Sequence, residues 1–203
     1  MVLPPFTTDG VLPAGDYAMT LAELKASYLV TGQGVESATW DATWREKLVD
    51  YLSELVAELW VVPMTGRIFI NGSFVTIKDH PGDIDGYFEC PQKSIASREL
   101  NRALNARNAH QIWVWDPQAF PLVPGFGTAK PPMWHRYRVE LFPEDPIFQM
   151  PAINTQAGML PFSVGFRLTR TGSPKGIIEI VQRSTTERQE RRQRRQDKRR
   201  TRC

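Results

Sequence analysis

The strongest hydrophobic pattern in the chain is helical and lies between Thr39 and Pro63. Apolar residues recur there at steps of three and four, at Trp44, Leu48, Tyr51, Leu52, Leu55, Val56 and Leu59. This spacing places them along one face of an α-helix and leaves polar residues on the other. We therefore expect an amphipathic helix of roughly five turns, which Pro63 ends because proline cannot continue a helix.

Shorter apolar runs predict strands. RIFIN (residues 67–71), DIDGYFEC (83–90) and HRYRVELF (135–142) are rich in β-branched and aromatic residues and are expected to be three strands. HQIWVW (110–115) is expected to be a fourth, short strand. Residues 162–182 predict two more strands, joined through a Gly-Ser-Pro turn as a hairpin.

Two further helices are expected between these runs. Thr20 and Glu23 have the spacing of a capping box, which opens a short helix. Residues 94–107 have a helix-forming composition, whereas residues 116–133 hold several prolines and are expected to be largely loop. Helices interleaved with strands in this order predict an α/β or α+β protein built on a sheet.

Composition narrows the class of protein. The 203 residues are 41% hydrophobic and include six tryptophans, which is typical of a folded globular chain. No apolar run approaches the roughly 20 residues needed to cross a bilayer, and the first residues do not resemble a secretion signal. Cys90 and Cys203 lack metal-ligand spacing. We expect a reduced, cytoplasmic protein without a membrane span.

Charge is distributed unevenly along the chain. Residues 183–203 hold ten Lys or Arg and three Asp or Glu, whereas residues 1–182 hold 15 basic and 19 acidic residues. The chain therefore divides into a mildly acidic domain (1–182) and an Arg-rich tail (183–203), helical or disordered, that has no apolar residue before Cys203. Such a tail would bind a nucleic-acid backbone, solubilise the protein, or dock on the acidic body. The candidate nucleic-acid contacts are Arg188, Arg191, Arg192, Arg194, Arg195, Lys198, Arg199 and Arg200.

Two acids in the second predicted strand are the first candidates for chemistry. Asp83 and Asp85 flank Ile84, so on a strand their side chains share one face. Two adjacent carboxylates are unfavourable unless a cation lies between them, and carboxylate oxygens suit Mg²⁺ or Mn²⁺. Upstream, Gly72 permits close backbone approach and Ser73 offers a hydroxyl and an N–H to a phosphate.

A third acid and several cations would complete such a site. Glu140 lies in the third predicted strand, and Arg136 and Arg138 share its parity, so we expect them on the same face as counter-charges for a polyphosphate. Lys78 and Lys175 would contact phosphate or remain solvated. Trp113 and Trp115 would pack in the core or form a base-stacking platform.

The motif at the centre of the chain resembles a known signature. Gly72-Ser73, nine intervening residues and then Asp83-Ile84-Asp85 resemble the signature of the DNA polymerase β-like nucleotidyltransferase superfamily. Three stretches, LPPFTTDGVLPAGDYAMT, INGSFVTIKDHPGDIDGYFE and GSPKGIIEI, are similar to a small bacterial and phage family of unknown function that is presumed to be nucleotidyltransferase-like. That resemblance spans roughly residues 3–181.

The resemblance implies a mixed sheet flanked by helices, and roles for individual residues. Gly72 and Ser73 would bind the triphosphate of an NTP, and Asp83 and Asp85 would hold Mg²⁺ or Mn²⁺ as catalytic ligands. Glu140 would be the third catalytic acid, at a position where many superfamily members have Asp. The sequence also departs from the pattern at Asn71, where an apolar or aromatic residue is usual.

Two functions of different classes follow. In the first, the protein is an enzyme that moves an NMP from an NTP to a hydroxyl of RNA or protein. Small nucleotidyltransferases of this kind often act as toxins, including those of toxin–antitoxin pairs, or as defence factors. In the second, a degenerate nucleotidyltransferase domain is a non-catalytic binding module whose tail binds nucleic acid or an acidic partner. The superfamily contains both kinds, so the resemblance alone does not decide between them.

Overall fold

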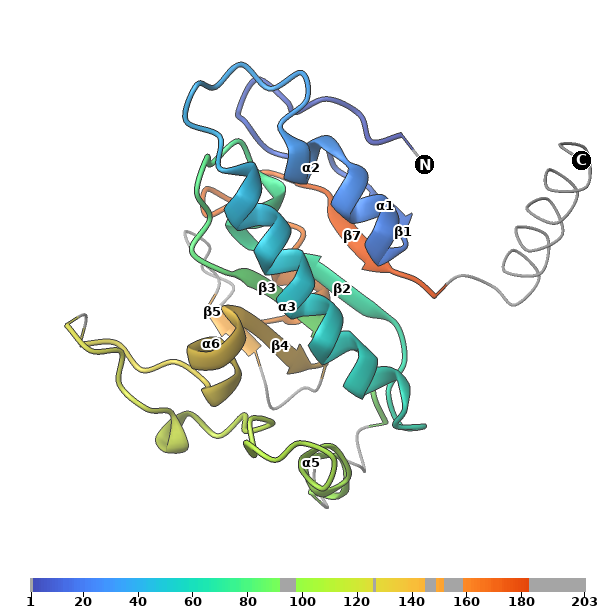
Figure 1. Cartoon of the computed structure of the whole chain (residues 1–203), viewed down its shortest axis with the longest axis vertical. Coiled ribbons are helices and arrows are strands. Elements are labelled where there is room, and N and C mark those ends of the chain that lie inside the picture. Colours follow the sequence, from blue (N-terminus) through green and yellow to red (C-terminus); the bar gives the residue numbers. More distant parts are fainter. Residues whose placement is uncertain (1, 92–97, 126, 145–148, 152–158, 183–203) are drawn as a thin grey trace, which may run out of the picture.

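A computed structural model of the chain describes residues 2–91, 98–125, 127–144, 149–151 and 159–182. It has a mixed α+β fold around a five-stranded sheet of order β1-β7-β2-β3-β4 (Figure 1). β7 pairs in parallel with β1 and antiparallel with β2. β3 pairs antiparallel with β2 and in parallel with β4. The strands are β1 (Asp16–Met19), β2 (Ile68–Asn71), β3 (Ile84–Phe88), β4 (Val139–Pro143) and β7 (Ile177–Ile180). β5 (Gln149–Pro151) and β6 (Met159–Pro161) form a separate antiparallel pair.

Most of the helices are short. The α-helices of the described residues are α1 (Leu21–Ala26), α2 (Tyr28–Thr31), α3 (Ala42–Trp60), α5 (Glu99–Asn105), α6 (Pro132–Tyr137) and α7 (Phe162–Gly165), and the 3₁₀ helices are η1 (Gly72–Val75) and η2 (Pro117–Ala119). Among these described residues, no helix is long and apolar enough to cross a membrane.

The long helix α3 covers one face of the sheet (Figure 1). It spans 19 residues, as the periodicity predicts, and its leucines and valines are buried, whereas Trp44 and Tyr51 are partly buried. They pack in one core with side chains from β2, β3, β4 and β7, among them Ile68, Ile70, Ile84, Val139 and Ile178. The predicted capping box is also present, since Thr20 and Glu23 bond each other's backbone N–H at the start of α1.

The opposite face of the sheet carries the alternate residues of the same strands. Phe69, Tyr87 and Phe142 lie on this face and pack with Phe162 and Phe166 of the α7 segment. Because side chains alternate along a strand, Asp85 shares this face with Tyr87, and Glu140 shares it with Phe142. The acids therefore lie away from α3, on the side that α7 covers.

Two strand predictions were wrong in part, although β4 and β7 lie largely within the predicted ranges. Residues 135–137 belong to α6, because Pro132 is favourable in the first turn of a helix, and the helix ends where Arg138 adopts a left-handed conformation with φ of 51°. Residues 162–165 are the helix α7, so the expected hairpin is reduced to one isolated bridge between Leu168 and Pro174.

The run at residues 110–115 forms no strand either. The backbone of Trp113, at its centre, bonds side chains: its N–H donates to Oδ1 of Asn105 (3.0 Å), and its carbonyl accepts from the amides of Asn101 (3.1 Å) and Asn105 (2.9 Å). These bonds satisfy the backbone polar groups without a neighbouring strand. The prediction also missed β1, a strand of only four residues. The Arg-rich tail (183–203) and part of the predicted helix at 94–107 lie outside the described residues.

Candidate metal and nucleotide site

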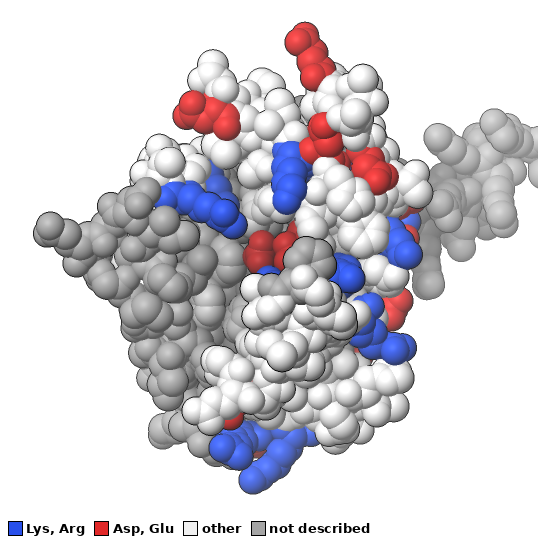
Figure 2. Space-filling view, turned by 90° about the vertical axis from the view of Figure 1, so that its left-hand side faces the viewer, with Lys and Arg blue, Asp and Glu red and all other residues white. Residues whose placement is uncertain are grey.

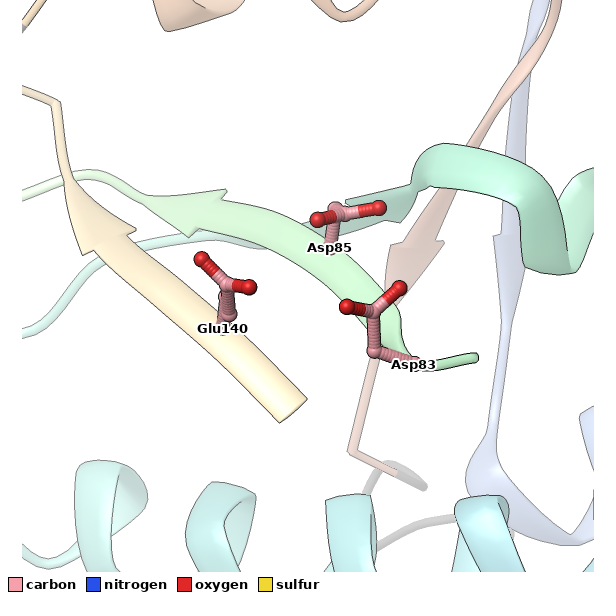
Figure 3. Close-up of side chains that lie close together, drawn as sticks. All are labelled: Asp83, Asp85 and Glu140. Carbon is pink, nitrogen blue, oxygen red and sulfur yellow. The ribbon is translucent and has the colours of Figure 1, made fainter. Parts of the chain in front are cut away.

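Three acids meet where β3 and β4 begin. Asp85 and Glu140 are register partners on these parallel strands, and Asp83 immediately precedes β3 with the same parity as Asp85. One carboxylate oxygen from each of the three lies within 4.8 Å of the others. Figure 3 shows the three side chains pointing to one side of the two strands, away from the helices on the other side. Strand parity predicts this convergence from the sequence.

The Gly72 turn passes directly against these acids. Gly72 has φ of +75°, and a Cβ placed on it would collide with Oδ2 of Asp85. Asn71 directly precedes this turn and pairs with Asp85 across β2 and β3. It is fully buried: its Oδ1 accepts from the N–H of Gly72 (2.7 Å), and its Nδ2 donates to the carbonyl of Gly176 (2.7 Å). The unusual asparagine therefore ties the turn to the segment that carries Lys175.

The acids are held in an environment that disfavours their charge. Burial, together with the charges of Asp83 and Glu140, raises the pKa of Asp85 to about 7. Burial also raises the pKa of Glu140; the hydrogen bond and charge of Lys130 oppose this shift, and the charge of Asp83 adds to it. Desolvated, mutually repelling carboxylates are a setting in which a bound cation is strongly favoured.

Lys130 lies against this cluster and was not predicted. Its Nζ bonds Oε1 of Glu140 and lies 3.5 Å from Oδ2 of Asp83, which also accepts a hydrogen bond from Nε1 of Trp134 (2.8 Å). Burial lowers the pKa of Lys130, but its interactions with the three acids outweigh burial and raise it overall. No pattern in the sequence marks this lysine, since it comes from a proline-rich segment that predicts only a loop.

The acids open into a cleft of about 820 Å³. Of the residues proposed for nucleotide binding, Gly72, Ser73, Lys78 and Lys175 line it. Burial lowers the pKa of Lys175 to about 8; Asp85 opposes this and Arg170 adds to it. Figure 2 shows acidic side chains in a recess near the middle of one face of the molecule, with Lys and Arg side chains around it.

The cleft is lined by side chains of two kinds. Hydroxyls and cations are contributed by Ser73, Thr76, Lys78, Thr169, Arg170 and Lys175. Apolar side chains are contributed by Phe142, Leu160, Phe162, Phe166 and Leu168. Thr76, Thr169, Arg170 and all the apolar residues were missed from the sequence. They come from the segment after β2, from β4, and from β6 and the residues that follow it, which have no shared spacing in the sequence.

Two predicted counter-charges lie elsewhere. Because residues 132–137 are helical, Arg136 and Arg138 do not extend β4, and neither is among the residues that line the cleft. The guanidinium carbon of Arg138 lies 3.8 Å from the centroid of the Trp134 ring, and Nε of Arg136 donates to the hydroxyl of Tyr137 (3.2 Å). The expectation that they face the acids was wrong, and Lys130 takes that place.

The paired tryptophans belong to the core. Trp113 and Trp115 are buried, and each indole N–H has a partner: Nε1 of Trp113 donates to Glu58 (2.6 Å) and Nε1 of Trp115 to the carbonyl of Leu141 (2.8 Å). Core packing was the correct interpretation of this pair, and a base-stacking platform was not. The tail arginines and lysines proposed for nucleic acid lie outside the described residues.

A buried arginine organises one wall of the cleft and was also missed. Arg45 of α3 is fully buried, and its guanidinium donates to the carbonyls of Leu29 (2.7 Å), Phe74 (2.8 Å), Thr76 (3.1 Å) and Lys78. Three of these carbonyls belong to the segment that follows Ser73. The sequence does contain a signal, because position 45 is three residues before Leu48 and so lies on the apolar face of the helix.

The chain belongs to a family of unknown function, DUF6932, whose profile matches residues 4–181. No curated protein and no solved structure matches it. Membership of this family assigns no chemical role to the residues of the cleft.

Proposed function

We propose that the protein is a metal-dependent nucleotidyltransferase that moves an NMP from an NTP to a hydroxyl of RNA or protein. The observation that carries this proposal is the convergence of Asp83, Asp85 and Glu140 within 4.8 Å, with the Gly72 turn directly against Asp85. Such a cluster beside a turn with phosphate-binding groups suits a metal-bound polyphosphate.

The three acids fit a pair of Mg²⁺ or Mn²⁺ ions. They offer only carboxylate oxygens, which are hard ligands, and the burial that raises the pKa of Asp85 and Glu140 favours a bound cation. Asp83 and Asp85 would hold the ions, and Glu140 would complete one ligand set. When bound, the ions would polarise the α-phosphate and neutralise the charge of the leaving pyrophosphate.

The mixed polar and apolar lining of the cleft supports a nucleotide over a small inorganic anion. The triphosphate would lie along Ser73, Lys78 and Lys175, where a hydroxyl and two ammonium groups are available. The sugar and base would lie against Phe142 and Phe166, because aromatic rings offer a flat apolar surface. A cleft for phosphate alone would need no such wall.

The reaction is an in-line displacement at the α-phosphorus. The acceptor oxygen forms a bond to this phosphorus while the bond to the bridging oxygen of the β-phosphate breaks, and pyrophosphate leaves. Glu140 would take the proton of the acceptor hydroxyl. The remaining contribution of the chain is to hold the reacting groups in line.

The positive charge of the tail suggests which kind of molecule accepts the NMP. The ten basic residues of the tail favour RNA over protein, since they would bind a polyphosphate backbone. A role as a toxin or defence factor rests on the resemblance alone, and a cytoplasmic setting rests on the cysteine usage and the first residues of the sequence; both belong to the same proposal.

The proposal is tested by incubating the protein with each α-labelled NTP, Mg²⁺, and either total RNA or cell lysate. We expect label to enter RNA or a protein band from one or a few of the NTPs, and Asp83→Asn to abolish this transfer. If the wild-type protein binds no metal–NTP and transfers no label, the non-catalytic binding module is the correct alternative.

A further inference from the structure

The ammonium group of Lys130 occupies the place of a cation. It bonds Glu140 and lies 3.5 Å from Asp83, so it bridges two of the three acids that would hold a metal. A primary ammonium is a compact point charge with three donors. It can therefore offset carboxylate repulsion in the same position as a metal ion, although it supplies only one positive charge.

The backbone that presents Lys130 is anchored separately from its side chain. The N–H of Lys130 donates to the carbonyl of Pro121 (3.1 Å), and the N–H of Val123 donates to the carbonyl of Thr128 (2.7 Å), so the two arms of this segment are bonded to each other. The Lys130 side chain itself is 31% exposed. The ammonium can thus leave the acids by rotation of its flexible stem, without movement of the backbone.

We propose that Lys130 is a built-in counter-ion that fills a metal position in the metal-free protein and moves onto the phosphates of the nucleotide when metal enters. The inference rests on the metal site of the proposed function. It adds that metal and nucleotide bind in a coupled way through one lysine.

The coupling follows from charge. A metal ion and the Lys130 ammonium repel each other and compete for the same oxygens of Glu140 and Asp83, so the lysine weakens metal binding when no nucleotide is present. Once displaced, the ammonium stays in a cleft whose other cations, Lys78, Arg170 and Lys175, repel it. A bound triphosphate is then the nearest negative partner. Because coupling is reciprocal, nucleotide would tighten metal binding and metal would tighten nucleotide binding.

Metal affinity measured without nucleotide tests this directly. Mn²⁺ binding is followed by electron paramagnetic resonance or calorimetry for the wild-type protein, Lys130→Met and Lys78→Met. Lys78 is the matched control, since it lines the same cleft but has no ion pair with the acids among the described residues. We expect Lys130→Met to bind Mn²⁺ at least about fivefold more tightly than the wild type, which is the lower end of typical coupling effects, and Lys78→Met to change affinity much less.

The second arm adds a non-hydrolysable NTP analogue. This analogue should tighten Mn²⁺ binding to the wild type by a larger factor than to Lys130→Met, because only the wild type has the lysine to move. If the methionine variant does not fold without metal, Lys130→Gln retains a hydrogen-bond donor to Glu140 and replaces it in both arms.

The outcomes separate this inference from the proposed function. If the wild type binds Mn²⁺ and the Lys130 variants bind it no more tightly, the counter-ion role is overturned while the metal site stands. If neither the wild type nor the Lys130 variants bind Mn²⁺, the metal site and the proposed function fail together. Tighter binding in both lysine variants alike would mean a general effect of cleft charge and would also overturn the role of Lys130.

Discussion

Asp85 of β3 and Glu140 of β4 are register partners on adjacent parallel strands, and their carboxylates project from the same face of the sheet. Two buried acids in this position destabilise the sheet unless a positive charge accompanies them. In the structure that charge is the ammonium of Lys130. The same relationship makes the site responsive to metal, to protons and to the packing of the Gly72 turn.

Divalent metal is expected to stabilise the protein through these acids. At about 100 times its dissociation constant, Mn²⁺ should add about 2.7 kcal/mol to the unfolding free energy, or roughly 5–10 °C in melting temperature for a chain of this size. Asp83→Asn combined with Asp85→Asn should abolish the shift. The metal-free double variant should melt at the same temperature as the wild type or higher, because a repulsion has been removed. Differential scanning fluorimetry with and without Mn²⁺ measures both.

A control for this experiment removes two acids elsewhere. Glu46 and Asp50 both form exposed ion pairs with Lys25 on the surface. Glu46→Gln combined with Asp50→Asn changes the net charge by the same amount and should leave the metal shift intact. A metal shift that survives in the Asp83 and Asp85 double variant would place the ion outside the cleft.

Gly72→Ala should disrupt the site by two separable effects. The new Cβ collides with the Asp85 carboxylate, and alanine is strained at φ of +75°. Strain and overpacking together should lower the unfolding free energy by about 2 to 4 kcal/mol, and displacement of Asp85 should weaken the Mn²⁺ response. Urea denaturation measures the loss of unfolding free energy, and the change in melting temperature on adding Mn²⁺ measures the displacement of Asp85.

Gly172 supplies the matched control for Gly72. It lines the same cleft with φ of +86°, but a Cβ there would meet nothing within 4 Å. Gly172→Ala should therefore cost only the conformational strain, about 1 to 2 kcal/mol, and keep the metal response. Equal losses of metal response in both variants would contradict a specific contact between Gly72 and Asp85.

Stability without metal should fall as pH rises through the range in which Asp85 titrates. The pKa of Asp85 is about 7 in the folded protein, against an ordinary value of 3.8. Between these values the folded state holds a proton that the unfolded state releases, so raising the pH lowers the unfolding free energy. Burial of Glu140 acts in the same direction. Urea denaturation with a chelator from about pH 4.5 to about pH 7.5 should show this fall, and Asp85→Asn should flatten it. Parallel curves for the two proteins would show that Asp85 is not the titrating group.

The local patterns of the sequence predicted the parts of the fold that depend on one element at a time. Helix α3 follows from its periodicity, and the convergence of Asp83, Asp85 and Glu140 follows from strand parity. The helix and the shared face of Asp83 and Asp85 are properties of neighbouring residues, which an alternating or helical pattern records directly. The position of Glu140 also depends on the pairing of β3 with β4, for which parity gives only the face.

What the sequence did not predict depends on contacts between distant segments. Lys130 meets Glu140 only because α6 folds the chain back onto β4, and the same helix removes Arg136 and Arg138 from the strand. Asn71 bonds Gly176 across 105 residues. The asparagines that satisfy the backbone of Trp113 replace a strand partner by side-chain bonds. No local pattern records such partners, so neither the position of Lys130 nor the side-chain bonding of residues 110–115 could be predicted from the sequence.

Arg45→Met should destabilise the whole protein and loosen one wall of the cleft. The substitution leaves the four carbonyls that Arg45 binds without this donor, and an unsatisfied buried group costs about 1–3 kcal/mol. We expect a loss of roughly 3–5 kcal/mol, since some carbonyls will find water, together with weaker nucleotide binding because the segment after Ser73 is no longer held. Arg67→Met is the control: Arg67 forms an exposed ion pair with Glu89, and its loss should cost under about 1 kcal/mol. Similar urea midpoints for the two variants would contradict the role of Arg45.

Truncation after Gln182 tests the tail separately from the cleft. Residues 183–203 hold ten Lys or Arg and no apolar residue before Cys203, so their removal takes away no hydrophobic packing. We expect the truncated protein to unfold at the temperature of the full chain and to keep its metal response. Its affinity for single-stranded RNA should fall, with a shallower dependence on salt, because the logarithm of the binding constant falls by about 0.7 per decade of salt for each phosphate neutralised on a single strand.

A full-length variant with glutamine at the tail's Lys and Arg positions separates charge from length. It should bind RNA like the truncated protein, since the phosphate contacts depend on charge. If both variants bind RNA as tightly as the wild type across a salt series, the contact lies on residues 1–182 instead. If truncation lowers the melting temperature while the glutamine variant does not, the tail contributes to the fold through its backbone, and the separation of the chain after residue 182 is wrong.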